Sequence, residues 1–175
     1  MIASTAVLLR SQGIAGTSFP KVLEHARAPR GSIGHHFPGG KTELLREAID
    51  LAGAEITRHL VTGAEAGADA ATIVDGICDY FATWLTRTDY TAGCPVAAAA
   101  QEAYADPDLG VSARQAIEDW TLAVTATMPG RNDARALAQV CIAAVEGAVM
   151  MARVTRSTEP LDSVRAQLRL LLTNR

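Results

Sequence analysis

The chain of 175 residues is 49% hydrophobic and 20% charged, so it is long enough to bury a substantial core and too apolar to be a disordered protein. Its apolar runs are much shorter than a membrane span and are interrupted by charges, and its first residues lack the pattern of a secretory signal. We therefore expect a cytoplasmic protein that does not enter a membrane.

The net charge of −3 is distributed unevenly along the chain. Residues 1–47 carry six basic and three acidic side chains, a net charge of +3, whereas the remainder carries ten basic and sixteen acidic ones, a net charge of −6. A basic head on an acidic body is typical of a protein that binds a polyanion at one end only.

The beginning of the chain predicts two short helices. Residues 2–12 repeat apolar side chains at helical spacing and are followed by Gly13, a candidate C-cap. Ser18 is a candidate N-cap for a second helix that ends near Ala26, with Pro20 tolerated in its first turn.

A third short helix is expected over residues 30–37, and with the second it forms a helix-turn-helix candidate. Ile33 and Phe37, four residues apart, would anchor this helix on its buried side. Its outer surface would be small or hydrogen-bonding, which suits contact with base edges. The residues of that surface are Arg30, Gly31, Ser32, Gly34 and His35.

Six longer helices are expected in the rest of the chain, where Pro, Gly and capping side chains mark many of their ends, such as the Asp106-Pro107 pair at the start of the fourth. Their predicted ranges are 41–62, 70–87, 95–104, 107–128, 133–153 and 160–172. No stretch alternates with the period of a strand. The predicted fold is therefore all-α with about nine helices: a three-helix head over residues 1–45, joined by a long helix to a helical body over residues 46–175.

The three cysteines, Cys78, Cys94 and Cys141, are scattered and form no cluster with histidine at zinc spacing. We expect buried, reduced thiols, with no metal and no cofactor. The segment Gly40-Lys41-Thr42 is similar to the end of a Walker A loop, but the partner glycine is displaced by one position and no strand precedes it, so a nucleotide site is not expected.

The segment GIAGTSFPKVLEHARAPRGSIGHHFPGGKTELL, residues 13–45, resembles the DNA-binding head of the tetracycline-repressor (TetR) family. More narrowly, it is similar to the LmrA/YxaF-type subgroup, in which HHFPGGK is usual. GCPVAAAAQEA, residues 93–103, and the Glu146-Gly147 pair also resemble the body of that subgroup. The resemblance implies a dimeric transcriptional regulator, a repressor that a small hydrophobic ligand releases from a palindromic, double-stranded operator.

The same resemblance implies DNA contacts around the second and third helices. Ser18, with neighbouring Thr17, would cap the second helix and touch a phosphate. Arg30 would contact either a guanine edge or a phosphate, and Lys41 would pair with a phosphate at the start of the long helix. The full expected set is Thr17, Ser18, Arg30, Gly31, Ser32, Gly34, His35, His36 and Lys41.

Gly34 is a departure from the family, which usually has tyrosine at this position. The glycine removes an aromatic contact and weakens the helix by about 0.5–1 kcal/mol relative to alanine. Alternatively, it lets the backbone approach the DNA more closely, and the sequence does not decide between these consequences.

In this family the body helices form the wall of an internal pocket, and most of the few aromatic side chains lie there. Each of them, taken individually, fits the core better than a ligand contact, but together with polar groups they suit a flat hydrophobic ligand. The expected ligand contacts are Tyr80, Trp84, Glu102, Tyr104, Trp120, Glu146 and Met150. The small-residue face of residues 132–153, together with residues 160–172, would pair two subunits, although packing within one subunit is the alternative.

Two further functions remain as alternatives. Gly34, together with a chain that begins later in the family pattern than is usual, is compatible with a helical small-molecule-binding protein whose DNA-binding head is degenerate. An enzyme that uses a cysteine or histidine of the body is the other alternative, but nothing in the sequence singles out a catalytic pair, so we expect no enzymatic activity.

Overall fold

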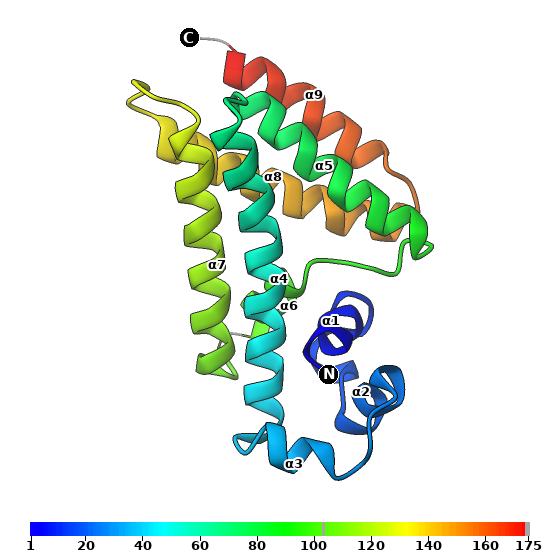
Figure 1. The fold of residues 1–175 in the computed structure, drawn as a ribbon. Helices are drawn as coiled ribbons and strands as arrows, with labels where there is room; N and C mark the ends of the chain where they lie inside the picture. The colour runs from blue at the N-terminus through cyan, green and yellow to red at the C-terminus, as the bar shows by residue number, and fades with distance from the viewer. Residues whose placement is uncertain (103, 174–175) are drawn as a thin grey trace. The chain divides into compact units, whose positions relative to one another are not determined.

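The computed structural model describes residues 1–102 and 104–173, and within them the chain is all helical, as predicted. These residues form nine α-helices and no strand (Figure 1). In chain order the helices are α1 (Ile2–Gly16), α2 (Phe19–Ala26), α3 (Ser32–His36), α4 (Gly40–Glu65), α5 (Ala70–Arg87), α6 (Pro95–Glu102), α7 (Pro107–Ala126), α8 (Ala134–Thr155) and α9 (Glu159–Thr173).

The helices group into two compact units. Unit 1 consists of Met1–Ala54 with Cys94–Ala116, and unit 2 of Glu55–Gly93 with Ile117–Arg175. The predicted head lies within unit 1, but this unit also contains α6 and the first turns of α7, because α6 packs on α1. Each unit is therefore built from two separate segments of the chain. The boundaries between the units fall within α4 and α7, so both helices contribute residues to both units.

Unit 1 is built around a small apolar core that joins the first four helices. Gly13 has φ 65° and interrupts α1 as the sequence indicated, although the helix resumes for about one turn before Thr17. Positive φ is accessible to glycine at no steric cost, which explains why the kink falls at this residue. The buried residues of the core are Leu8, Val22, Phe37 and Leu44, with Met1, Ile2 and Phe19 packed against them.

Helix α3 is shorter than the predicted range 30–37, because it begins only at Ser32. The N–H of Ser32 donates to the carbonyl of Pro29 at 3.0 Å, so the residues between them form a turn rather than a first helical turn. Glycines at 31 and 34 lower the helical propensity of this segment, which accounts for the lost residues.

Acidic side chains cap two of the helix starts. Asp69 accepts a hydrogen bond from the N–H of Thr72 at 2.8 Å at the start of α5, and this bond lowers the pKa of the Asp69 carboxyl. Asp106, whose pairing with Pro107 predicted the start of α7, accepts from the N–H of Leu109 at 3.4 Å. Both bonds satisfy N–H groups that have no partner within the helix.

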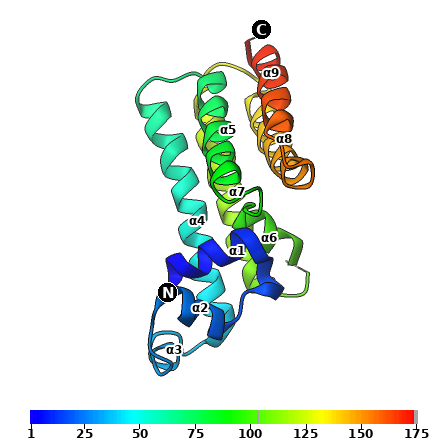
Figure 2. The ribbon, with the colours of Figure 1, turned by 90° about the vertical axis from the view of Figure 1, so that its right-hand side faces the viewer.

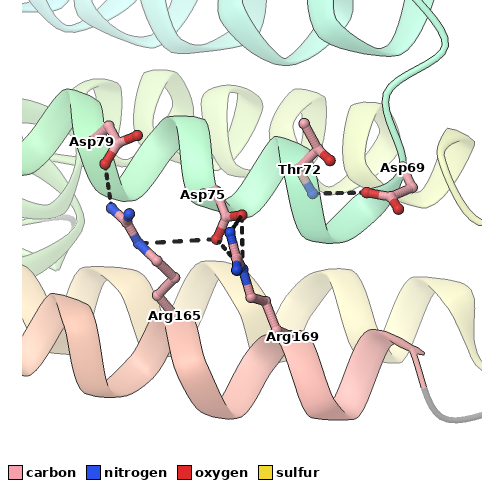
Figure 3. Close-up of polar contacts among 6 residues, drawn as sticks. All are labelled: Asp69, Thr72, Asp75, Asp79, Arg165 and Arg169. Carbon is pink, nitrogen blue, oxygen red and sulfur yellow. Dashed lines mark hydrogen bonds and ion pairs between the residues drawn. The ribbon is translucent and has the colours of Figure 1, made fainter.

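Unit 2 contains a network of ion pairs between α5 and α9 (Figure 3). The Nε of Arg169 donates to both carboxylate oxygens of Asp75, at 3.0 and 2.9 Å. Arg165 donates to Asp79, and its Nε lies 3.9 Å from Asp75. Because exposed pairs contribute at most about 1 kcal/mol each, the network serves mainly to fix the register of α9 on α5.

Among the described residues, one helix, α8, is long and apolar enough to cross a membrane by length and composition alone. Its apolar run is interrupted by Glu146, as the sequence analysis describes for the chain as a whole. Core helices of soluble proteins pass the same test, so the observation is weak evidence for a membrane. Its apolar side chains divide into a face buried in unit 2 and a second, exposed face that includes Val140 and Val154.

Candidate functional site

The helix-turn-helix predicted from the sequence is formed by α2 and α3. Figures 1 and 2 both place α3 at the edge of unit 1 that is away from α6. Arg27 turns the chain between the helices in the left-handed conformation, with φ 50°, and the N–H of Ala28 donates to the carbonyl of Leu23 at 3.0 Å. Ile33 and Phe37 are buried, which confirms the predicted anchor of α3.

The outer surface of α3 is available to a partner. Arg30, Gly31, Gly34, His35 and His36 are exposed. Ser32, at the start of the helix, is half-buried. This surface combines a cationic side chain with small and hydrogen-bonding groups. Such groups suit contact with phosphates and base edges in a groove of a nucleic acid.

A hollow lies beside Arg30 at the surface of unit 1. Phe19, Pro20 and Leu23 of α2 line one part of it, and Arg30, Ile33 and Gly34 line the remainder. A Cβ atom added at Gly34 would meet no heavy atom within 4 Å, so this glycine is not required by the packing of the free protein.

Replacing Gly34 with alanine should therefore stabilise the head by about 0.5–1 kcal/mol, because alanine loses less conformational entropy on forming a helix. Urea unfolding followed by circular dichroism tests this. Gly31→Ala is the control. Because Gly31 precedes α3, this substitution should stabilise the head less than Gly34→Ala does. A lower stability of Gly34→Ala would contradict the open packing around this residue. A concurrent loss of DNA affinity would show that the DNA backbone approaches Gly34 closely.

The structure corrects the role expected for Thr17. Its side chain is only 1% exposed, its hydroxyl donates to the carbonyl of Gly13 at 2.7 Å, and its N–H donates to that of Ile14 at 3.2 Å. The expectation that Thr17 touches a phosphate is therefore wrong, because both of its donors are used inside the protein. Ser18 does occupy the N-cap position of α2, but its side chain makes no capping hydrogen bond.

The basic side chains of the head are not equally available. Arg10 is only 4% exposed and cannot contribute to an outer surface. Lys41 is exposed, and its ammonium donates to the carbonyl of Ile14 at 3.2 Å. Lys21 was not among the predicted DNA contacts, yet it is exposed in the first turn of α2. Its position close to the start of the second predicted helix is the sequence feature that could have identified it.

A cavity of about 40 Å³ lies within unit 2 among α4, α5, α7 and α8. It has room for about two or three water molecules. Two of the predicted ligand contacts, Trp120 and Glu146, line it. The complete lining is Ile56, Leu60, Ile73, Val74, Ile77, Phe81, Trp120, Val124, Cys141, Ile142, Val145 and Glu146.

The other five predicted ligand contacts do not line this cavity. Tyr80 and Trp84 are half-buried, and the ring of Tyr80 lies 5.2 Å from that of Phe81. Glu102 and Tyr104 are exposed residues of unit 1, and Met150 is 61% exposed on α8. The prediction followed aromatic and polar residue types, whereas most of the wall consists of isoleucine and valine.

Burial raises the pKa of the Cys141 thiol to about 11, from an ordinary value of 9.0. Folding therefore favours the protonated thiol, and its contribution to stability is intact below pH 9 and lost as the pH rises to 11. We expect the free energy of unfolding to fall by about 2–3 kcal/mol over this interval. Urea unfolding at pH 8.5 and pH 11 measures the loss, which should be smaller in Cys141→Ala. An equal loss in both proteins would contradict the assignment.

The structure offers no group of three or more histidine, cysteine, aspartate or glutamate side chains placed to hold a metal ion, within residues 1–102 and 104–173. All three cysteines are buried free thiols, as predicted.

The chain is similar to known regulators over both of its units. Residues 1–48 match the family described as bacterial regulatory proteins, tetR family, and residues 70–167 match the C-terminal domain of LmrA/YxaF-like transcriptional regulators. An uncharacterized HTH-type transcriptional regulator of Mycobacterium tuberculosis is 39% identical over 184 residues, covering 98% of this chain and 92% of the relative.

More distant proteins show the same pattern. The HTH-type transcriptional regulator LmrA of Bacillus subtilis is 25% identical over 166 residues, covering 92% of this chain and 88% of LmrA. The crystal structure of a TetR-family transcriptional regulator from Agrobacterium tumefaciens matches with a TM-score of 0.86 at 17% identity, covering 99% of this chain and 95% of that one. At this identity the match to the crystal structure is a likeness of fold alone.

Proposed function

Because the chain belongs to the TetR family of transcriptional regulators, in its LmrA/YxaF-like branch, we propose that it is a dimeric repressor that a small hydrophobic ligand releases from a palindromic operator. The observation that carries this proposal is the exposed outer surface of α3, with Arg30 at its edge and Ile33 and Phe37 anchoring it from behind. Such a protein acts in the cytoplasm and needs no catalytic chemistry.

The proposed DNA surface consists of Ser18, Arg30, Gly31, Ser32, Gly34, His35, His36 and Lys41, and we include Lys21 because it is exposed in the first turn of α2. Arg30 would enter the major groove, while Lys21 and Lys41, whose ammonium groups both lie at the end of α1, would meet phosphates. Two heads of a dimer would contact half-sites about 34–36 Å apart, or a multiple of that distance. The two-fold symmetry of such a dimer is what makes a palindromic operator the expected target.

An exposed apolar stripe on α8 supports the dimer. Along one face of the helix, apolar or small residues recur at spacings of three or four. The members of this α8 stripe are Ala136, Val140, Ala143, Ala144, Gly147, Met150, Met151 and Val154. Val154 is 82% exposed, and Leu170 and Leu171 of α9 are exposed as well. An exposed apolar stripe of this length is typical of an interaction surface, and a second copy of the chain is the partner we assign to it.

The cavity of unit 2 supports a ligand-responsive body. Its volume of about 40 Å³ is far below that of a drug-sized site, about 300 Å³ or more. Binding therefore requires the helices that line it to separate. Helix α4 lines the cavity through Ile56 and Leu60 and also carries Lys41. A ligand that binds one conformer of α4 more tightly than another would shift the population toward that conformer, and the affinity for DNA would change with the population.

A helical small-molecule-binding protein with a degenerate head remains the rival function, since Gly34 replaces the usual tyrosine. A salt titration separates the two. A repressor should bind its preferred duplex with an affinity that falls steeply with salt, by a slope of about −0.9 for each phosphate contacted, and should bind random duplexes far more weakly. A shallow slope without preference between duplexes would support the rival.

A further inference from the structure

The hollow beside Arg30 has mostly apolar walls although it lies in the basic part of the chain. Apolar side chains of α2 and α3 supply most of its lining, which consists of Phe19, Pro20, Leu23, Arg30, Ile33 and Gly34. Of these described residues, Arg30 alone carries a charge. Pro20 and Gly34 are exposed, and a Cβ atom added at Gly34 would meet no heavy atom within 4 Å, so the hollow can be reached from outside.

The hollow belongs to the surface that is proposed to face DNA, because Arg30 and Gly34 are members of both. Residues 1–47 carry a net charge of +3, which complements a polyanion. Successive nucleotides of a duplex are only about 3.4 Å apart along its axis. When Arg30 contacts one base pair, the edge of a neighbouring base is therefore brought to the hollow, whose volume of about 580 Å³ leaves room for it.

Apolar walls are unfavourable for most of the groups that base edges present. The nitrogen and oxygen atoms of the major groove are hydrogen-bond donors and acceptors, and beside carbon walls they would lose water without gaining a partner. The C5 methyl group of thymine is the apolar group that distinguishes one base edge from the others in this groove. A hollow walled mainly by carbon therefore favours thymine over the other three bases.

We propose that the hollow takes the C5 methyl group of a thymine next to the base pair that Arg30 contacts, so that each half-site is read by one cationic and one apolar contact. The inference rests on the proposed function, since it requires α3 to enter the major groove. It also assigns a role to Gly34, which leaves space for the methyl group where a larger side chain would fill the hollow.

Removing the methyl group alone tests the inference. The probe is a duplex selected from a random pool by the wild-type protein, in which deoxyuridine replaces one thymidine of each half-site at a time. The substitution keeps every hydrogen-bonding group of the base. At one position the affinity, measured by fluorescence anisotropy, should fall by about fourfold for each half-site, the factor expected from burial of one methyl group. With cytosine at that position, methylation at C5 should raise the affinity by a similar factor.

A substitution in the protein tests the location of the contact. Gly34→Leu should fill the hollow, so the ratio of the affinities for the thymine and uracil duplexes should fall toward one, whatever its absolute affinity. Ala15→Leu adds the same side chain at an exposed position of α1 that does not line the hollow, and it should keep the wild-type ratio.

The possible results lead to distinct conclusions. A selected half-site without thymine, or equal affinities for the thymine and uracil duplexes at every position, would overturn the inference. A ratio that persists unchanged in a folded Gly34→Leu protein would overturn it too, since the methyl group would then be bound elsewhere. If no duplex is selected, the proposed function and the inference fail together. Sequence-specific binding that is indifferent to the methyl group would sink the inference alone.

Discussion

Replacing Arg30 with alanine is expected to weaken operator binding by about 10- to 100-fold, the loss that follows when a bidentate contact to a guanine is removed. Arg30 is exposed at the edge of α3, next to an apolar hollow, so its side chain is free to enter the groove and its removal should leave the fold intact. Fluorescence anisotropy with the preferred duplex and its single-base variants measures both the loss of affinity and any relaxation of preference.

The control for this substitution is Arg114→Ala, because Arg114 is also exposed in unit 1 but lies on α7, away from α2 and α3. It lowers the net charge by the same amount. If Arg30 contacts only a phosphate, the salt slope should fall by about one and the preference among bases should persist. Unchanged binding by Arg30→Ala would contradict its placement on the DNA surface.

Replacing Met151 with glutamate in the α8 stripe is expected to convert the proposed dimer to a monomer. The side chain is 53% exposed in the single chain, so the monomer should fold normally. In the proposed dimer the substitution places a carboxylate from each copy in an apolar interface, where an uncompensated charge costs several kcal/mol. Operator affinity should then fall by at least about 100-fold, because each monomer contacts only one half-site.

Sedimentation equilibrium measures the change in assembly, and Gln139→Glu is its matched control. Gln139 is exposed on the same helix but beside the stripe, so the added charge should leave the dimer in place. A Met151→Glu protein that still sediments as a dimer would contradict the assignment of this face. A wild-type protein that sediments as a monomer would contradict it equally.

The positions of the helices were largely predictable because local signals mark them. The Asp106-Pro107 pair predicted the start of α7, and the helix begins at Pro107. Residues 70–87 were predicted as one helix, and α5 spans Ala70–Arg87. On α4, helical spacing alone fits either His59 or Leu60 as an inner residue, whereas in the structure Leu60 is buried and His59 is exposed.

The candidate sites were less predictable, because they depend on packing between segments distant in the sequence. Thr17 belongs to the segment that resembles the DNA-binding head, yet the kink at Gly13 directs its hydroxyl to an internal carbonyl. Tyr104 and Met150 are residue types suited to a ligand, but they lie on exposed surfaces. Helical periodicity locates buried faces and does not show which buried residues border a cavity.

The division of charge between head and body was visible from composition, but its distribution in space was not. Arg10 counts toward the basic head, although it is buried and contributes nothing to a DNA-facing surface. Conversely, Lys21 and Lys41 are exposed near the helix-turn-helix, where the sequence analysis selected only the second of them.

The central claim is that α3 recognises duplex DNA by sequence in a two-fold arrangement. Selection of bound duplexes from a random pool by the purified full-length protein, followed by sequencing, tests this most directly. We expect enrichment of a palindrome whose half-sites are centred one helical turn, or a multiple of it, apart, and loss of that enrichment in Arg30→Ala. A pool that remains random after repeated rounds, or an enriched site without two-fold symmetry, would contradict it.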